Sequence, residues 1–368
     1  MHLALAPRRR LAALAGSAAP ELLAALDAAL AARAAAGIAS LAYDPEVGVP
    51  ALGLPPAPLE PAALISQVKA ADRALAACGE AVESLWIVGG PRALPFAGLP
   101  NPMPDRDGPL RTDAPYGLAG PDELIPRWPV GRTPDADPPV PGLLAALLRA
   151  VAAAHVRAPR CSTGGVVALG AARWAAVTAE VLANAGPALV LSSPPIRSGS
   201  AELGSLAGAR VVYCNLHGVR GRDAWFGQAP GDSELVPALH PADLAGLRLD
   251  GAVVITQACF GARLAAVEDQ LPLAVTLLRA GATALFGAIG LTYGAPELPP
   301  GESDLLAAAL LSALRRPGVR LGEALLMAQI SVLRTALRRQ GALDPDEVKT
   351  LLGFMLYGDP ALSLEGSE

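Results

Sequence analysis

Two polar residues, Cys259 and His217, each end a run of apolar residues that predicts a buried strand. Cys259 ends 'DGAVVITQAC' at 250–259, and His217 ends 'ARVVYCNLH' at 209–217. A thiol becomes a nucleophile when a neighbouring base raises its thiolate fraction, and imidazole is the side chain that titrates near neutral pH. These residue types therefore point to acyl transfer at a carbonyl carbon, with Cys259 as nucleophile and His217 as general acid and base.

Glycines come after both residues at positions that suit this chemistry. Gly218 comes directly after His217, and Gly261 comes after Cys259 and Phe260. Acyl transfer needs two N–H donors for the oxyanion that forms at the attacked carbonyl. Glycine permits tight turns and a close approach of the backbone. We therefore expect the backbone N–H groups of Gly218 and Cys259 to line an oxyanion hole.

Each residue taken alone has an ordinary structural explanation. A cysteine in an apolar strand is usually a small buried hydrophobe, and a histidine at a strand end is usually a satisfied structural residue. Their joint context favours catalysis, because 'QACFG' at 257–261 is close to the caspase pattern Q-A-C-x-G with a histidine upstream. Phe260 stands where that pattern lists Arg, Gln or Gly.

'NLHG' at 215–218 and 'QACFG' together resemble the His-Gly and Ala-Cys signature of caspases, gingipains, clostripain, separase and CHAT proteases. Within this superfamily, further segments are similar to the gingipain family in order and spacing. They lie between about residues 84 and 364 and are 'PVGRTP' at 129–134, 'HGVRGRDAWFG' at 217–227, 'AGATALFGAIGLTYGAP' at 280–296, 'LGEALLMAQ' at 321–329 and 'YGDPAL' at 357–362.

The resemblance implies amide hydrolysis through a thioester, with Cys259 as nucleophile, His217 as acid and base, and Gly218 and Cys259 as oxyanion donors. Neither a metal nor an organic cofactor is implied. Tyr293 lies near the position of an aromatic wall of the gingipain specificity pocket, although a packed loop tyrosine explains it equally well. No residue corresponds clearly to the acidic group that reads arginine in arginine-specific members, so cleavage after Arg or Lys is not implied.

The elements that must position these residues alternate along the chain. Continuous apolar strands that alternate with helices predict an α/β fold with a mostly parallel sheet covered on both faces, and ligands collect at the carboxyl ends of such strands. The expected strands are 38–43, 84–90, 165–171, 209–218, 250–261 and 282–290, and the expected helices are 62–78, 141–156, 175–186, 271–280, 303–314 and 321–338. The resemblance implies a caspase-like three-layer sandwich, with an N-terminal helical extension (1–35), an N-terminal α/β subdomain (36–150) and a catalytic subdomain (151–366).

The N-terminal stretch has two interpretations. Arg8–Arg10 precede a run rich in Ala and Leu, as in a signal peptide. Glu21, Asp27 and Arg33 interrupt that run at helical spacing, which favours a surface helix over residues 20–35. We expect the helix.

Several further residues are expected to be structural. Asp113 and Arg132 are of the types that form ion pairs, and Asp359 precedes a proline in a pattern typical of turns. His155 has no partner pattern and is expected at the surface. Cys214 lies on the strand before His217 and is expected in the core.

Composition bounds the partners. The net charge is −5 with a pI near 5.5, so the basic excess that nucleic-acid binding requires is missing. No later segment is expected to span a membrane, because long apolar runs contain Gly, Pro or charge. The four cysteines (78, 161, 214 and 259) show no CxxC spacing, which argues against a zinc site or a disulfide framework and favours a reducing, cytoplasmic location.

The sequence thus predicts a cysteine endopeptidase that acts on a protein or peptide, with no nucleic-acid or membrane partner. The alternative is a catalytically silent caspase-like interaction module, since family likeness alone does not establish activity. The oligomeric state is not predicted.

Overall fold

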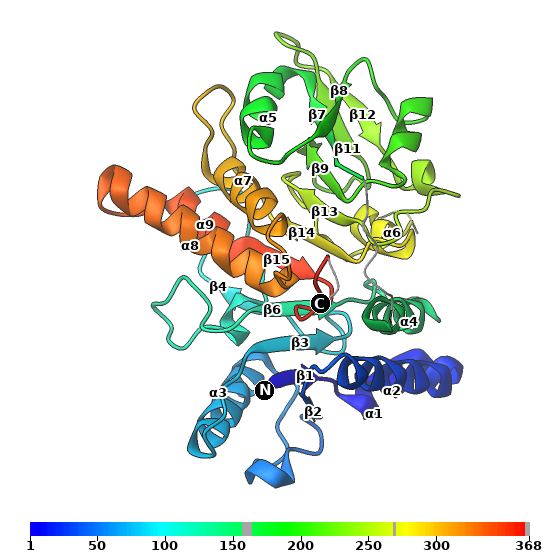
Figure 1. The fold of residues 1–368 in the computed structure, drawn as a ribbon, viewed down its shortest axis with the longest axis vertical. Helices are drawn as coiled ribbons and strands as arrows, with labels where there is room; N and C mark the ends of the chain where they lie inside the picture. Colours follow the sequence, from blue (N-terminus) through cyan, green and yellow to red (C-terminus); the bar gives the residue numbers. More distant parts are fainter. Residues whose placement is uncertain (157–163, 268–269, 365–368) are drawn as a thin grey trace.

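One ten-stranded sheet runs through the computed structural model, which describes residues 1–156, 164–267 and 270–364 (Figure 1). The strand order is β2-β1-β3-β6-β15-β14-β13-β9-β7-β8. Helices cover both faces, so the fold is a three-layer α/β sandwich, as expected. The sheet is mostly parallel, which was also expected. It divides into two halves at β15 (Phe354–Tyr357).

The first half is built from short parallel strands whose alternate side chains face two separate cores. Leu3, Leu85 and Ile87 pack with α3 on one face, while Ala4 and Trp86 pack with α1, α2 and α4 on the other. This alternation follows from the two-residue period of a strand. The elements are β1 (His2–Leu5), β2 (Ser40–Tyr43), β3 (Ser84–Val88), β6 (Val130–Thr133), α1 (Arg8–Ala15), α2 (Ala19–Ala35), α3 (Pro61–Ala77) and α4 (Leu143–Val156).

The second half repeats this architecture with longer strands. Its parallel strands are β7 (Val166–Ala171), β8 (Ala188–Ser193), β9 (Val211–Asn215), β13 (Val253–Thr256) and β14 (Ala284–Ala288). Helix α6 (Leu273–Arg279) packs on one face. The other face is covered by α5 (Ala175–Leu182), α7 (Glu302–Leu314), α8 (Leu321–Gln340) and α9 (Pro345–Gly353).

Strand β15 reverses the direction of the sheet. It pairs antiparallel with β14 and parallel with β6. The strands of the two halves therefore run in opposite directions, and their carboxyl ends lie at opposite rims of one sheet.

Two small antiparallel sheets stand outside the large one. The first consists of β10 (His217–Gly218), β11 (Trp225–Gln228) and β12 (Leu235–Leu239), and the second of β4 (Ala97–Leu99) and β5 (Leu110–Thr112). Because β10 begins almost where β9 ends, the three-stranded sheet is attached directly to the carboxyl rim of the second half.

The expected strands and helices are all present, with ends that shift by a few residues. The strand β1 was not expected: it pairs with both β2 and β3, so residues 1–35 contribute a strand to the sheet as well as helices. Four residues, 'HLAL', are too few to show a strand period. The subdomain boundaries at residues 35 and 150 stay predictions.

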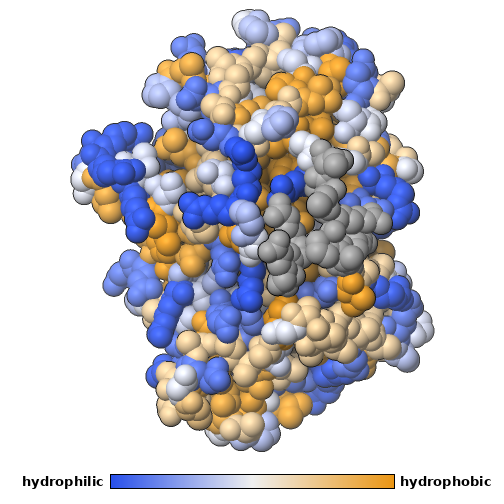
Figure 2. All heavy atoms as spheres, viewed as in Figure 1, coloured by the Kyte–Doolittle hydropathy of each residue, from blue (hydrophilic) through white to orange (hydrophobic). Residues whose placement is uncertain are grey.

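The helix expected at residues 20–35 is α2, and it packs against the body of the protein. By length and composition alone, Arg8–Ala35 is one stretch of the described residues that is apolar enough to cross a membrane. In the structure it is divided between α1 and α2, and Leu22 and Leu26 of α2 are buried in the core shared with α4. On the face shown in Figure 2, charged side chains are interspersed among the apolar ones.

A buried charged cluster closes the first half. Arg33 of α2 contacts Asp359, which also accepts a hydrogen bond from His155 Nε2 (2.8 Å). The expectation of a surface His155 was wrong, because its side chain is only 2% exposed. Asp359 accepts a bond from the N–H of Ala361 (2.9 Å), so its expected role in the turn is confirmed. The cluster joins segments from both ends of the chain, which sequence spacing does not reveal.

Candidate active site

The strands that lead to His217 and Cys259 are parallel neighbours. β9 pairs with β13 in a register that sets Cys214 opposite Thr256. His217 and Cys259 come shortly after the carboxyl ends of these strands, and both are partly exposed. The topology thus brings the two segments to the same rim, where parallel sheets commonly bind ligands.

The backbones of Gly218 and Cys259 are in direct contact. A Cβ atom at Gly218 would lie 1.6 Å from the carbonyl oxygen of Cys259 and 2.9 Å from its nitrogen. No side chain fits at that distance, so glycine is required here for space rather than for its dihedral angles. Within the described parts of the chain, the N–H of Cys259 has no acceptor. The close approach places one unpaired donor beside Gly218, as an oxyanion hole requires.

The turn after Cys259 has an unusual backbone. Phe260 has a φ of 58°, the left-handed region that non-glycine residues rarely adopt, and it is the single non-glycine residue with positive φ in the described segments. Two hydrogen bonds hold it: Phe260 N–H to Gly290 O (2.8 Å) and Gly261 N–H to Ala258 O (2.9 Å). Such a conformation costs about 1–3 kcal/mol and is concentrated at functional sites.

The sulfur of Cys259 lies against Thr292, in the segment after β14. The Thr292 N–H donates to Sγ at 3.4 Å. The Thr292 hydroxyl donates to the carbonyl oxygen of Gln257 (2.6 Å). Its oxygen lies 3.6 Å from Sγ of Cys259. An N–H donor stabilises a thiolate more than a thiol. Thr292 was not singled out from the sequence, because nothing in its local pattern connects it with Cys259.

The imidazole of His217 is held on two sides. Nε2 lies 2.9 Å from Oε1 of Gln228, and the ring packs at 4.1 Å, tilted, against Trp174. Burial lowers the pKa of His217 below its usual value; the hydrogen bond to Gln228 opposes this, and Arg173 adds to it. The ring is therefore neutral at neutral pH, the form that accepts a proton from a thiol.

Gln257 of the 'QACFG' segment supports the nucleophile turn. Its amide nitrogen donates to Ser303 Oγ (2.9 Å) and Asp304 Oδ1 (2.8 Å) at the start of α7, and its oxygen accepts from the Tyr213 hydroxyl. The side chain is 6% exposed. Gln257 therefore fastens the Cys259 segment to α7 and to β9, which gives this glutamine a structural role.

Tyr293 lies next to Thr292 but is tied to a loop of the first half. Its hydroxyl donates to Asp105 (2.5 Å), and Lys349 bonds both Asp105 (2.5 Å) and Asp107 (2.8 Å). Lys349 is 2% exposed on its side chain, so it neutralises much of the acidic pair. The assignment of Tyr293 to a specificity pocket stays a prediction.

The residues expected to be structural behave accordingly. Arg132 donates to both carboxylate oxygens of Asp113 (2.8 and 2.6 Å), and both side chains are buried. Cys214 is fully buried, and burial raises the pKa of its thiol to about 12. Cys161 lies outside the described residues. Cys78, Cys214 and Cys259 are free thiols, and the described residues contain no cluster of three metal-ligating side chains.

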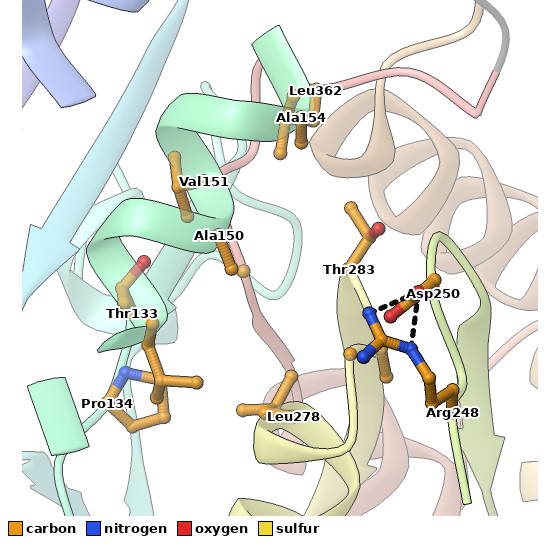
Figure 3. A pocket seen from close by; sticks show the side chains of 14 residues that line it. Thr133, Pro134, Ala150, Val151, Ala154, Arg248, Asp250, Leu278, Thr283 and Leu362 are labelled. Carbon is orange, nitrogen blue, oxygen red and sulfur yellow. Dashed lines mark hydrogen bonds and ion pairs between the residues drawn. The ribbon is translucent and has the colours of Figure 1, made fainter. Parts of the chain in front are cut away.

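A cavity of about 210 Å³ opens at the opposite rim, between α4 and α6 (Figure 3). It adjoins Thr283, which precedes β14, whereas Thr292 comes after β14. Its wall is mostly apolar, and its charged members, Arg248 and Asp250, are paired with each other (2.7 Å). The charged side chains of this cavity are therefore bonded to each other, and the cysteine and histidine lie at the other rim.

A family model matches the segment that begins shortly after His217. Residues 223–365, which include Cys259, match the model of peptidase family C25. No curated protein sequence matches the chain.

Solved structures share the fold over the whole chain. The Arg-specific cysteine proteinase gingipain R has a TM-score of 0.66 at 13% identity, covering 100% of this chain and 78% of its own. A structure described as a protease has a TM-score of 0.68 at 14% identity (98% and 78% covered), and the complex of the pro- and mature domains of Porphyromonas gingivalis RgpB has 0.66 at 13% (98% and 79%). Residues 223–365 thus match peptidase family C25, and the whole chain shares the fold of gingipain R, which together point to a gingipain-like, cysteine-type peptidase.

Proposed function

We propose that the chain is an endopeptidase in which Cys259 and His217 form the catalytic dyad. His217 takes the thiol proton of Cys259, and the thiolate attacks the carbonyl carbon of a peptide bond. The oxyanion accepts hydrogen bonds from the backbone N–H groups of Cys259 and Gly218. The C–N bond then breaks, and the imidazolium donates its proton to the leaving amine, which leaves a thioester on Cys259.

The second half of the reaction restores the enzyme. His217 removes a proton from water, and the resulting hydroxide attacks the thioester carbonyl. The C–S bond breaks, and a carboxylic acid leaves. The Cys259 thiolate then recovers a proton from the imidazolium. Every proton is carried by His217, and water is the co-reactant.

The contact between Gly218 and Cys259 carries this proposal. It brings the segment after β9 and the segment after β13 together at backbone distance. A side chain at residue 218 would collide with the Cys259 backbone, so glycine is what allows the two segments to meet. The left-handed Phe260 and the Thr292 N–H that donates to Sγ add support, since both concern the same turn.

The proposed substrate is a polypeptide, and the residue recognised at its cleavage site is left open. Arg specificity requires an unpaired acidic group in the pocket, and Asp105 and Asp107, the carboxylates beside Tyr293, are already bonded to Lys349. We therefore do not extend the Arg specificity to this chain. A cytoplasmic location stays part of the proposal.

The test is an electrophilic peptide probe, such as a library of acyloxymethyl ketones, applied to the native protein and read by mass spectrometry. We expect selective adduct formation on Cys259, and we expect Cys259→Ala to lose hydrolysis of a peptide library by at least about 10³-fold while it keeps its melting temperature.

Hydrolysis by the Cys259→Ala protein would show that the nucleophile is misassigned. A folded protein that neither reacts with the probe nor cleaves any peptide would instead favour the silent interaction module. Cys78→Ala is the matched control, because Cys78 is an exposed free thiol that the proposal leaves out of catalysis.

A further inference from the structure

A glutamine that the sequence did not single out makes the hydrogen bond to the imidazole of His217. Gln228 lies on β11, two residues beyond Phe226, which pairs with His217 across the small sheet. The side chains of Gln228 and His217 share a face of that sheet because strand side chains alternate. Gln228 is 6% exposed, and its Oε1 lies 2.9 Å from His217 Nε2.

The orientation of the Gln228 amide is determined by a second bond. Its nitrogen donates to the carbonyl oxygen of Asp232 at 2.6 Å, and a carbonyl oxygen can only accept. The amide oxygen must therefore face the imidazole. An oxygen acceptor at Nε2 requires that Nε2 carry the proton of the neutral ring, which leaves the lone pair on Nδ1.

We propose that Gln228, together with Trp174, is a positioning residue that holds His217 in one tautomer and one orientation, with Nδ1 free to exchange the proton of the Cys259 thiol. The inference rests on the proposed function of the dyad. The Gln228 side chain bonds His217 and the Asp232 carbonyl oxygen, so it acts through His217. Trp174 completes the clamp because its ring packs on the imidazole at 4.1 Å and prevents rotation.

A neutral partner suits the electrostatics of this histidine. The groups that act on the ring are Gln228 on β11 and Trp174 and Arg173 in the 3-10 turn after β7. Arg173 is the charged group among these, and it disfavours the imidazolium. A carboxylate at position 228 would favour the imidazolium and trap the proton. Glutamine gives the same hydrogen-bond direction without that charge.

Two substitutions separate positioning from simple packing. Gln228→Leu keeps the size but removes the acceptor, and we expect kcat to fall by roughly 10²-fold with little change in KM, as for other loss of histidine orientation. Gln228→Glu restores the acceptor and adds a charge. We expect it to move the acid limb of the kcat/KM profile upward by about one pH unit and to recover most of kcat above that limb.

The control is Gln329→Leu. Gln329 is also a buried glutamine whose nitrogen donates to a backbone carbonyl, that of Leu351 (2.8 Å), but it lies on α8, outside the site. We expect this variant to lower the melting temperature without moving the pH profile. A stability loss at Gln228 alone would therefore not count as support.

A measurement without turnover tests the tautomer directly. In the full-length Cys259→Ala protein, nitrogen NMR shifts of the His217 ring, assigned by their loss in a His217→Asn version, should report a proton on Nε2. A proton on Nδ1, or unchanged kcat and pH profile in both Gln228 variants, would overturn the role of Gln228 while Cys259-dependent hydrolysis by the wild-type protein still upholds the dyad. Loss of that Cys259 dependence would refute the dyad itself.

Discussion

The two halves of the sheet have the same architecture but end their strands differently. In the first half, β6 ends in Arg132 and Thr133, both buried, and Arg132 is bonded to Asp113 and to the carbonyl oxygens of Gly89 and Leu94. In the second half, the corresponding rim carries the partly exposed His217 and Cys259. Both halves thus have polar side chains at the carboxyl ends of their parallel strands. Those of the first half are buried, whereas His217 and Cys259 in the second half are partly exposed to solvent.

The difference lies in the segment that comes after each strand. After β3 the chain turns so that the carbonyl oxygens of Gly89 and Leu94 accept from the guanidinium of Arg132 in β6, whose other donors bond Asp113. After β9 the chain enters the small sheet β10–β12, which holds the imidazole at the surface and brings Gly218 against Cys259. A catalytic site therefore needs side chains near the strand ends that neighbouring residues orient, but whose hydrogen-bonding atoms are not all used by those neighbours.

The largest effect is expected from Asp113→Ala. Removing one partner of a buried bidentate pair leaves the Arg132 charge uncompensated, which costs about 3–5 kcal/mol of unfolding free energy. Denaturant unfolding measures this loss, and activity per folded molecule should be unchanged. Asp27→Ala, which breaks the exposed pair with Arg8, is the control and should cost no more than about 1 kcal/mol. Equal losses for the two variants would contradict a structural role for the buried pair.

A somewhat smaller effect is expected from an added methyl group at Gly218. Gly218→Ala forces the Cys259 backbone away and disrupts the proposed oxyanion donors, so we expect kcat to fall by about 10²- to 10³-fold in a folded protein. Gly131→Ala is the counterpart in the first half, because its Cβ would lie 2.7 Å from Gly358 O. That variant should lower the melting temperature and leave the kcat of the folded fraction intact. Steady-state kinetics of both variants will distinguish the two rims.

The smallest effects concern how stability and activity depend on pH. Each half contains a histidine whose titration contributes to one of them. Burial lowers the pKa of His2 to about 4, although Glu83 opposes this, and burial also lowers the pKa of His217. A depressed folded-state pKa stabilises the protein above the unfolded pKa near 6.5, and this contribution is lost as pH falls through the folded value. Stability should therefore decline between about pH 6.5 and 4, and His2→Gln should flatten that slope.

Activity should respond to the other histidine. Because the pKa of His217 is lowered, the acid limb of kcat/KM should lie below about pH 6.5 and stay in place in His2→Gln. Thermal melts and pH–rate profiles of the same samples will separate the two responses. If the acid limb of the kcat/KM profile moves in His2→Gln, activity depends on the first half, and the contrast between the two halves of the sheet is wrong.

Local patterns were sufficient for the main elements. The apolar runs before His217 and Cys259 predicted two strands with polar ends, and β9 and β13 are parallel neighbours. The expected burial of Cys214 is confirmed, and Asp113 and Arg132, expected to take part in structural ion pairs, are paired with each other. These features follow from residue type and period, which act over a few residues.

Other features arise only when distant segments meet. Trp174 and Gln228 reach His217 from separate elements, Thr292 reaches Cys259 from beyond β14, and His155 is buried because Asp359 lies beside it. Each of these contacts joins residues from separate segments of the chain. The periodicity of a helix or a strand therefore does not predict them.

The sequence by itself determined where two apolar strands lie, and therefore which thiol and which imidazole come shortly after their carboxyl ends. Tertiary structure decided that the sheet reverses at β15, that the two rims face opposite ways, and that one backbone fits so tightly against another that only glycine is possible at residue 218. The physical reason is that strand formation depends on neighbours along the chain, whereas a close contact between two loops depends on the packing of everything beneath them.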